Sequence, residues 1–309
     1  MRWATAEDKN KVLVLSEKYH GDLDYLPSYY DSFLQNPVSV PFVISKDSEI
    51  IGYMSGFVID NGETIAQRAG IMSPKFQNRG YLKLLNEQII AEARKRYNIQ
   101  RMVSAVDSDN PYIQSKAFWE MYTSVISTKD MFRYMVIPNQ LISSELPKSH
   151  PLKNMPIHVV AEYFDTEVVR KYLFPEDRIV INWIPYRLLP SNLALLECEN
   201  TVCVSDVQVC NRMVSGLLSI ATFYTIRRPR YAYTLDLYGS DVSSVRHHLL
   251  YHLKFIANEL KDLACLSIVV GKQLDKQKLF DVIAECGLNK LTDSGDPNKT
   301  LHYYMECNL

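Results

Sequence analysis

Apolar and polar residues follow one another in blocks that predict a mixed α/β fold for the first half of the chain. A short strand at residues 2–5 leads into a helix over residues 6–19. A second helix starts at Pro27 and ends before Pro37, because proline cannot continue a helix. Three β-rich runs, residues 41–45, 50–59 and 64–72, follow with turn signals between them and predict an antiparallel meander.

A long amphipathic helix is predicted after the meander, over residues 80–97. Leu84, Leu85 and Ile89 share its apolar face. A strand at 101–106, a helix from Asn110-Pro111 through Tyr122 and a strand at 130–137 complete the order β-α-α-β-β-β-α-β-α-β.

Residues 138–156 contain four prolines without sustained periodicity, which is typical of a linker. Beyond them the order of elements is repeated, and we infer the duplication of one α/β unit. The expected boundaries are 1–138, a linker at 139–156, and a second unit at 157–309. Its predicted elements are a strand at 157–161, helices at 166–173 and 190–196, strands near Val202 and at 216–225 and 231–237, a helix at 245–260, a strand at 266–270, a helix at 276–286 and a strand at 301–307.

Composition narrows the possible partners and the compartment. The 34 basic and 35 acidic residues among 309 give a formal charge of −1, so no global field attracts nucleic acid or anionic lipid. The N-terminus lacks the apolar core of a signal peptide, no stretch has the apolar length of a membrane span, and the six cysteines lack a CxxC pair. We therefore expect a cytoplasmic protein with reduced thiols, while its oligomeric state is not indicated.

The turn between the meander and the long helix carries the strongest chemical signal. It reads Met72-Ser73-Pro74-Lys75-Phe76-Gln77-Asn78-Arg79-Gly80-Tyr81-Leu82. Free N–H groups and the helix dipole make such a turn an anion site, Gly80 lets a ligand approach the backbone, and Arg79 adds a cation. A pyrophosphate would fit there, and a polar turn that only caps the helix is the alternative.

This turn resembles motif A of the GNAT acetyltransferases, Gln/Arg-x-x-Gly-x-Gly/Ala, in the family's β-α-α-β-β-β context. Gln77 and Gly80 match, and Leu82 stands where the family has Gly or Ala, so that it either crowds the pantetheine or packs inward. The resemblance implies tandem GNAT-like domains of the α/β (α+β) class, each a mixed, mostly antiparallel sheet flanked by helices. It also implies acetyl-CoA as cosubstrate, bound by Met72, Ser73, Gln77, Asn78, Arg79, Gly80, Tyr81 and Leu82, and no metal.

The same resemblance implies direct transfer of acetyl to an amine. Backbone N–H groups near Met72 would stabilise the oxyanion. Tyr122, in a run that resembles the helix after the fifth strand, would protonate the departing thiolate, and a core aromatic is its alternative reading. Glu63 and Asp24 are candidates for the general base, which the sequence does not assign.

Three further stretches are similar to the family of vertebrate histidine N-acetyltransferases, including its mammalian paralogue. They are Gly21-Asp22-Leu23-Asp24-Tyr25-Leu26-Pro27, Asn182-Trp183-Ile184-Pro185-Tyr186-Arg187 and Asp236-Leu237-Tyr238-Gly239-Ser240-Asp241. Asp24 and Tyr25 could hold an ammonium or imidazole, or only form a turn, and Trp183, Tyr186 and Arg187 could hold a carboxylate, or form a structural pair between domains. Asp236 and Tyr238 are expected to bind substrate as well, and this expectation rests on the resemblance alone.

The second unit has no glycine cradle, because Asp241 stands at its helix start and would repel pyrophosphate. We therefore expect only the first unit to bind coenzyme A. His248 and His252 have a metal-compatible spacing but no third ligand, so no metal is expected. The resemblance favours a free amino acid as acceptor, most of all the α-amine of L-histidine. Another amine, a protein lysine, or non-catalytic binding of coenzyme A or an amino acid are the alternatives.

Overall fold

The chain folds as a mixed α/β protein around one large sheet. The structure, a computed structural model, describes residues 1–108, 110, 113, 116–122, 124–138, 152–196, 200–288 and 299–309. Most of the predicted linker, including residues 139–151, lies outside the described residues, as do Pro111 and Cys198. The division into two domains with this linker therefore stays a proposal.

The first half forms the predicted elements, with bounds that differ by a few residues. Pro27 lies in the first turn of α2, and Gly80 precedes α3 in the left-handed conformation. Leu85 and Ile89 of α3 are buried as predicted, whereas Leu84 is exposed. The elements are β1 Arg2–Trp3, η1 Ala6–Asp8, α1 Lys9–His20, η2 Gly21–Leu23, α2 Leu26–Gln35, β2 Ser39–Lys46, β3 Glu49–Ile59, η3 Asp60–Gly62, β4 Thr64–Met72, η4 Pro74–Phe76, α3 Tyr81–Arg94, β5 Arg101–Asp107, α4 Lys116–Met121 and β6 Ser124–Val136.

The second half follows the predicted order with one wrong element and two additional hairpins. Residues 157–161, predicted as a strand, form a 3-10 helix that buries Ile157 and Val160, three residues apart. The hairpins are β8–β9 and β11–β12. The elements are β7 Lys153–Asn154, η7 Ile157–Ala161, α5 Glu162–Asp165, α6 Glu167–Leu173, β8 Arg178–Ile181, β9 Ile184–Arg187, α7 Pro190–Ala194, β10 Thr201–Ser205, β11 Gln208–Cys210, β12 Met213–Ser215, β13 Leu218–Thr225, β14 Tyr231–Tyr238, α8 Val242–Phe255, η8 Ile256–Leu260, β15 Ala264–Val270, α9 Lys276–Glu285 and β16 Lys299–Asn308.

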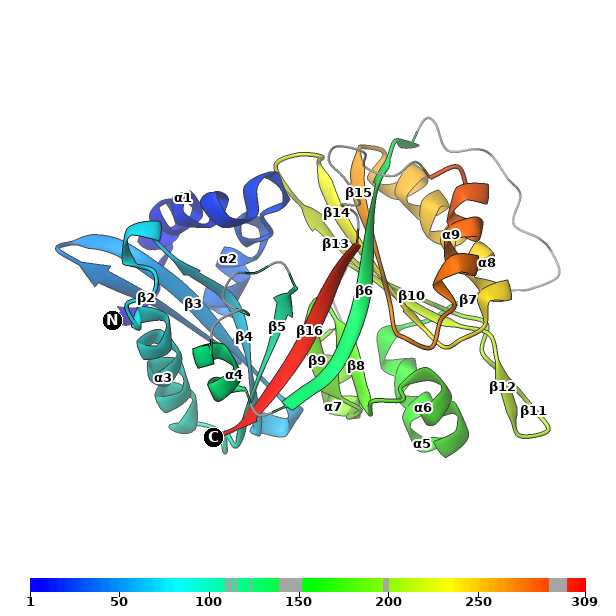
Figure 1. Ribbon diagram of the computed structural model, residues 1–309, viewed down its shortest axis with the longest axis horizontal. Helices are drawn as coiled ribbons and strands as arrows, with labels where there is room; N and C mark the ends of the chain where they lie inside the picture. Colours follow the sequence, from blue (N-terminus) through cyan, green and yellow to red (C-terminus); the bar gives the residue numbers. More distant parts are fainter. Residues whose placement is uncertain are drawn as a thin grey trace.

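The two halves exchange strands and thereby share one sheet. Its order is β1-β2-β3-β4-β5-β16-β6-β15-β14-β13-β10-β7. Figure 1 shows β16, in red, lying between β5 and β6 of the first half. In turn β6 lies between β16 and β15. The expected tandem architecture is therefore confirmed, but its two sheets are fused into a single twelve-stranded one.

Helices cover both faces of the first half, and a shared core joins the halves. α3 packs on the face of Ile51, and α1 and α2 pack on the opposite face, that of Ile50. A third apolar cluster joins Phe57 and Val103 of the first half to Tyr186 and Leu218 of the second. None of the helices among the described residues is long and apolar enough to cross a membrane.

The sheet opens between β4 and β5 but stays closed at the equivalent place in the second half. β4 and β5 pair in parallel only where residues 64–66 meet residues 101–103. Their counterparts β14 and β15 pair over residues 231–237 and 264–270. β4 also carries a bulge, where Ala69 has a φ of 51° and the register against β3 shifts. The strands therefore separate toward the carboxyl end of β4, whereas β14 stays paired with β15 along nearly its whole length.

Candidate active site

A cavity of about 470 Å³ lies beyond the point where β4 and β5 separate. Residues of both strands form its floor, Tyr122 closes one side, and His302 of the exchanged strand β16 forms part of its wall. Trp183 and Tyr224 reach it from the second half. The site is therefore built jointly by the two halves.

The turn before α3 offers an open anion site at one end of this cleft. Asn78 and Gly80 have positive φ angles of 58° and 81°, and no side chain caps the N-terminus of α3. A Cβ at Gly80 would meet nothing within 4 Å, so glycine is favoured there by its conformation rather than by crowding. Arg79 and Lys46 both lie over the ring of Phe76 and add positive charge. These residues fit the pyrophosphate of coenzyme A.

The β4 bulge, rather than Met72, faces the cavity. Ser73 donates its N–H to the Ile51 carbonyl at 2.7 Å, and the Met72 carbonyl accepts a hydrogen bond from Gln77 at 3.4 Å. By contrast, Ala69 and Gly70 line the cavity where the strand leaves its regular register. Sequence reasoning missed this bulge, because Ala69 in the left-handed region has no distinctive pattern.

Leu82 lies against the strand at a place where a side chain is missing. It lines the cavity, and its Cδ1 would be 3.9 Å from a Cβ built on Gly70. That distance is ordinary van der Waals contact, so the leucine that replaces the small residue of motif A packs against the strand at Gly70. Leu82 narrows the cavity beside Met54 without closing it.

Tyr122 points its hydroxyl toward β4. The side chain is buried at 4% exposure, and its O–H donates to Oε1 of Gln67 at 2.5 Å. Both residues line the cavity, and Phe118 packs against the Tyr122 ring with centroids 4.9 Å apart. A phenol held in this way is placed to act on a group in the cleft, and Gln67 is a further polar residue that the sequence did not indicate.

Tyr25 and Arg68 form the wall next to the bulge. The Arg68 guanidinium lies 5.3 Å from the Tyr25 ring centre and donates to the Asn182 carbonyl at 2.6 Å. Burial raises the pKa of the Tyr25 phenol, although Arg68 and the Ala69 N–H act in the opposite direction. Tyr25, predicted from sequence to bind substrate, therefore does lie at the cavity as a neutral phenol.

A two-residue hairpin turn carries Trp183 into the cavity. Asn182 and Trp183 both have positive φ, 49° and 66°, as a tight turn between paired strands requires. The Trp183 ring packs at a tilt of 34° against His302, with centroids 4.6 Å apart, and Nδ1 of His302 lies 2.5 Å from Oδ1 of Asp107. His302 and Asp107 were not predicted, since nothing in the sequence links residues so far apart.

Comparisons with known proteins agree with this architecture. The model described as "Acetyltransferase (GNAT) family" matches residues 10–121, and "Histidine N-acetyltransferase, C-terminal" matches residues 146–270. The chain therefore contains a domain of the GNAT acetyltransferase family. It is an acetyl-CoA-dependent N-acetyltransferase.

Individual relatives cover most of the chain at low identity. The histidine N-acetyltransferase of Xenopus tropicalis is 26% identical over 271 residues, 81% of this chain and 78% of the relative. The Homo sapiens protein named "Probable N-acetyltransferase 16" is 25% identical over 295 residues, 84% and 73% of the two chains. A tandem GNAT protein from the clavulanic acid biosynthesis pathway has a TM-score of 0.57 at 11% identity, over 98% of this chain and 95% of its own. This last likeness shows the tandem GNAT fold.

Three polar residues predicted for catalysis or acceptor binding lie outside the lining of the GNAT cleft. The buried carboxylate of Asp24 accepts hydrogen bonds from Ser16 and from the Leu26 N–H, both at 2.9 Å. Glu63 forms an ion pair with Arg101, and Arg187 lies 3.9 Å from each of the carboxylates of Asp60 and Glu63. Neither Asp24 nor Glu63 reaches the cavity as a base, and Arg187 joins the two halves instead.

Tyr186, Asp236 and Tyr238 belong to the interior between the halves rather than to the cleft. Tyr186 is part of the shared apolar cluster, and the Tyr238 hydroxyl hydrogen-bonds the backbone of Val180. Burial raises the pKa of Asp236 to about 7, although buried Lys129 opposes the shift. No contact with the cavity supports their predicted role in substrate binding.

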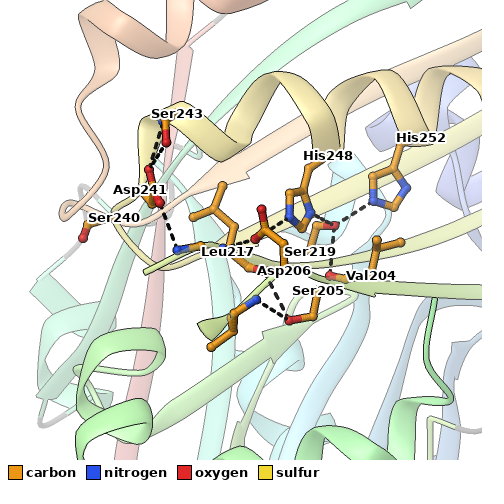
Figure 2. Close-up of polar contacts among 12 residues, drawn as sticks. Val204, Ser205, Asp206, Leu217, Ser219, Ser240, Asp241, Ser243, His248 and His252 are labelled. Carbon is orange, nitrogen blue, oxygen red and sulfur yellow. Dashed lines mark hydrogen bonds and ion pairs between the residues drawn. The ribbon is translucent and has the colours of Figure 1, made fainter. Parts of the chain in front are cut away.

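The histidine pair of the second half belongs to a buried hydrogen-bond network, shown in Figure 2. Nδ1 of His248 and Nε2 of His252 meet the Ser219 hydroxyl at 2.7 and 2.9 Å. Nε2 of His248 lies 3.1 Å from Asp206, and Nδ1 of His252 lies 2.6 Å from the Tyr233 hydroxyl. Among the described residues no group of three or more His, Cys, Asp or Glu could hold a metal ion. The histidines thus have hydroxyl and carboxylate partners.

Proposed function

We propose that this GNAT enzyme acetylates the α-amine of a free amino acid, with L-histidine as the preferred acceptor. The proposal keeps the acceptor expected from sequence but changes the residue that would bind its carboxylate. It is supported by the charge and aromatic character of the cavity and by the names of the curated relatives.

One observation carries the proposal: an arginine without a counter-charge lines the cleft. Arg133 of β6 is half-buried at the cavity, and within the described residues it makes no ion pair or hydrogen bond. Arg187, in contrast, faces two carboxylates. A guanidinium binds a carboxylate in two parallel hydrogen bonds, so Arg133 is the residue suited to a free amino acid.

Aromatic side chains supply a second recognition surface. Trp183, Tyr25 and Tyr224 line the cavity from different elements, and the rings of Tyr25 and Tyr224 lie 6.4 Å apart. Such faces pack against a planar ring such as imidazole. An acceptor with an α-carboxylate and an aromatic side chain therefore matches the cavity better than a polyamine does.

The acetyl donor would be bound by the turn before α3 and by the bulge of β4. The residues from Asn78 to Tyr81 would hold the pyrophosphate of acetyl-CoA, which supplies the acetyl thioester. A backbone N–H at the β4 bulge would stabilise charge on the carbonyl oxygen, a contribution of about 3 kcal/mol for one such donor. The Tyr122 hydroxyl would protonate the departing thiolate, and no covalent enzyme intermediate is needed.

Kinetics with histidine and histamine test the acceptor and its anchor. Because a hydrogen-bonded charge pair contributes roughly 1.5–3 kcal/mol, Arg133→Gln should raise KM for histidine about 10- to 100-fold and leave KM for histamine nearly unchanged. Arg187→Gln is the matched control, since that guanidinium lies outside the cavity. Equal effects of Arg133→Gln on both amines, or no acetylated histidine in a mass-spectrometric screen, would refute the proposal.

A further inference from the structure

An amine that is protonated near neutral pH must lose a proton before it can attack a thioester, and the cleft contains few groups that can take it. Asp24 and Glu63 point elsewhere. The arginines are always protonated, and burial raises the pKa of Cys265 and the pKa of Tyr224, which keeps thiol and phenol neutral. Among the described residues of the cavity wall, Asp107 and His302 remain as proton acceptors.

These two residues face each other across a strand pair formed by chain exchange. His302 of β16 stands opposite Asp107 of β5 in the antiparallel register, and Nδ1 lies 2.5 Å from Oδ1. The histidine side chain is 4% exposed, whereas the aspartate is 49% exposed. The imidazole is thus fixed by a carboxylate that itself stays in contact with solvent.

The other ring nitrogen of His302 has no partner among the residues that the structure describes. Nε2 is buried and forms no hydrogen bond within the described residues, while the ring packs against Trp183 at a tilt of 34°, with centroids 4.6 Å apart. A carboxylate on Nδ1 selects the tautomer whose proton lies on Nδ1 and leaves a lone pair on Nε2. An unpartnered buried acceptor at a substrate cavity is costly and calls for a ligand that donates to it.

We propose that His302 is the general base of the acetyl transfer and that Asp107 is its positioning residue. The inference rests on the proposed function only in requiring an acceptor whose amine is protonated near neutral pH. Nε2 takes one proton from the ammonium group and later releases it to solvent. The neutral nitrogen then forms its bond to the carbonyl carbon, and the carbon–sulfur bond breaks.

Protons balance across the two sides of the cleft. The attacking nitrogen must lose a second proton to become an amide, and the leaving sulfur must gain one. Tyr122 gives its proton to the sulfur and is restored by the proton from the nitrogen. The net reaction releases one proton, which is the proton that His302 accepted first.

The test measures kcat, KM and acetyl-CoA affinity in the full chain from about pH 6 to about pH 9. His302→Gln should lower kcat about 100- to 10,000-fold near neutral pH with unchanged acetyl-CoA affinity, and the loss should shrink as pH rises and the amine deprotonates unaided. His302→Ala should regain activity with added imidazole. His158→Gln, on an exposed histidine of η7, is the matched control and should behave as wild type.

Asp107→Asn provides a second variant at a more exposed position. Without the carboxylate the imidazole is no longer held in the tautomer that leaves a lone pair on Nε2, so kcat near neutral pH should fall, the loss of kcat should shrink as pH rises, and acetyl-CoA affinity should stay unchanged. A merely structural pair would lower activity equally at every pH.

Two results would overturn the assignment. The first is a wild-type pH profile of kcat in His302→Gln. The second is a loss of kcat that is the same at every pH and that added imidazole does not reverse in His302→Ala. If histidine is not acetylated, the acceptor proposal fails, and the same variants assayed with whichever amine is turned over still decide the role of His302.

Discussion

The buried His252 predicts an acid-dependent loss of stability that can be assigned to one side chain. Its imidazole is fully buried between the hydroxyls of Ser219 and Tyr233. Burial, together with the charge of nearby His248, lowers the pKa of His252 to about 3 from the ordinary value of 6.5. The folded state therefore binds fewer protons than the unfolded state between these two pH values, and stability must fall as pH drops below about 6.5.

The size of this effect follows from the two pKa values. At about pH 5 an unfolded histidine is almost fully protonated and the buried one is almost fully neutral. The free energy of unfolding is therefore about 2 kcal/mol lower at about pH 5 than at about pH 7.5. Asp206 changes the free energy of unfolding little between these two pH values, because the pKa of its carboxyl is lowered to about 2 in the folded state from an ordinary value of 3.8, and both values lie below about pH 5.

Urea unfolding at these two pH values measures the effect. His252→Gln removes the titrating group and keeps an amide that can bond both hydroxyls, so the pH dependence of the unfolding free energy should shrink by about 2 kcal/mol whatever the variant's stability at pH 7.5. His158→Gln, at an exposed position, should keep the wild-type dependence. If His252→Gln also keeps it within about 0.5 kcal/mol, the buried neutral histidine is not its cause.

Three further substitutions test the donor side and the joint between the halves. Gly80→Asp and Gly80→Asn carry the same left-handed strain, of roughly 1–2 kcal/mol, and differ in the negative charge of the aspartate. Calorimetry should therefore show weaker acetyl-CoA binding for Gly80→Asp than for Gly80→Asn, and equal affinities would exclude a nearby pyrophosphate. Tyr122→Phe should lower kcat about 100-fold without changing acetyl-CoA affinity, and an unaltered kcat would make Tyr122 a core residue only. Asn192→Ala removes three hydrogen bonds, two buried ones to Asp60 and a partly buried one to Arg187, and should lower the free energy of unfolding in urea by about 3 kcal/mol. Exposed Asn10→Ala should lower it little, and equal losses for the two variants would refute the role of this network.

Local features of the site could be predicted because they depend on neighbours in the chain. The strand at residues 64–72, the glycine turn and the helix after it follow from alternation, from the conformational freedom of Gly80 and from helical periodicity. Asp241, expected at the start of the second-half helix, caps α8 by accepting from the Ser243 N–H. Each of these inferences needs only a few consecutive residues.

Features that depend on distant partners could not be predicted. Alternation identifies residues 301–307 as a strand but does not say that it pairs with β5, so the contact of His302 with Asp107 stayed hidden. The segment from Trp183 to Arg187 was interpreted as one wall of a pocket. In the structure Trp183 lies at the hairpin tip, and four residues of extended strand place Arg187 about 13 Å away, beside Asp60.

The exchange of β6 and β16 also constrains when this enzyme can become active during its synthesis. The first half has its motif, its helices and its acyl-donor turn within residues 1–122, yet its sheet lacks the neighbour of β5 until β16 has been made. A nascent chain that stops short of residue 299 exposes the edges of β5 and β6, and such edges are templates for aggregation. Because His302 arrives on that same strand, completion of the sheet and the arrival of the proposed base are a single event.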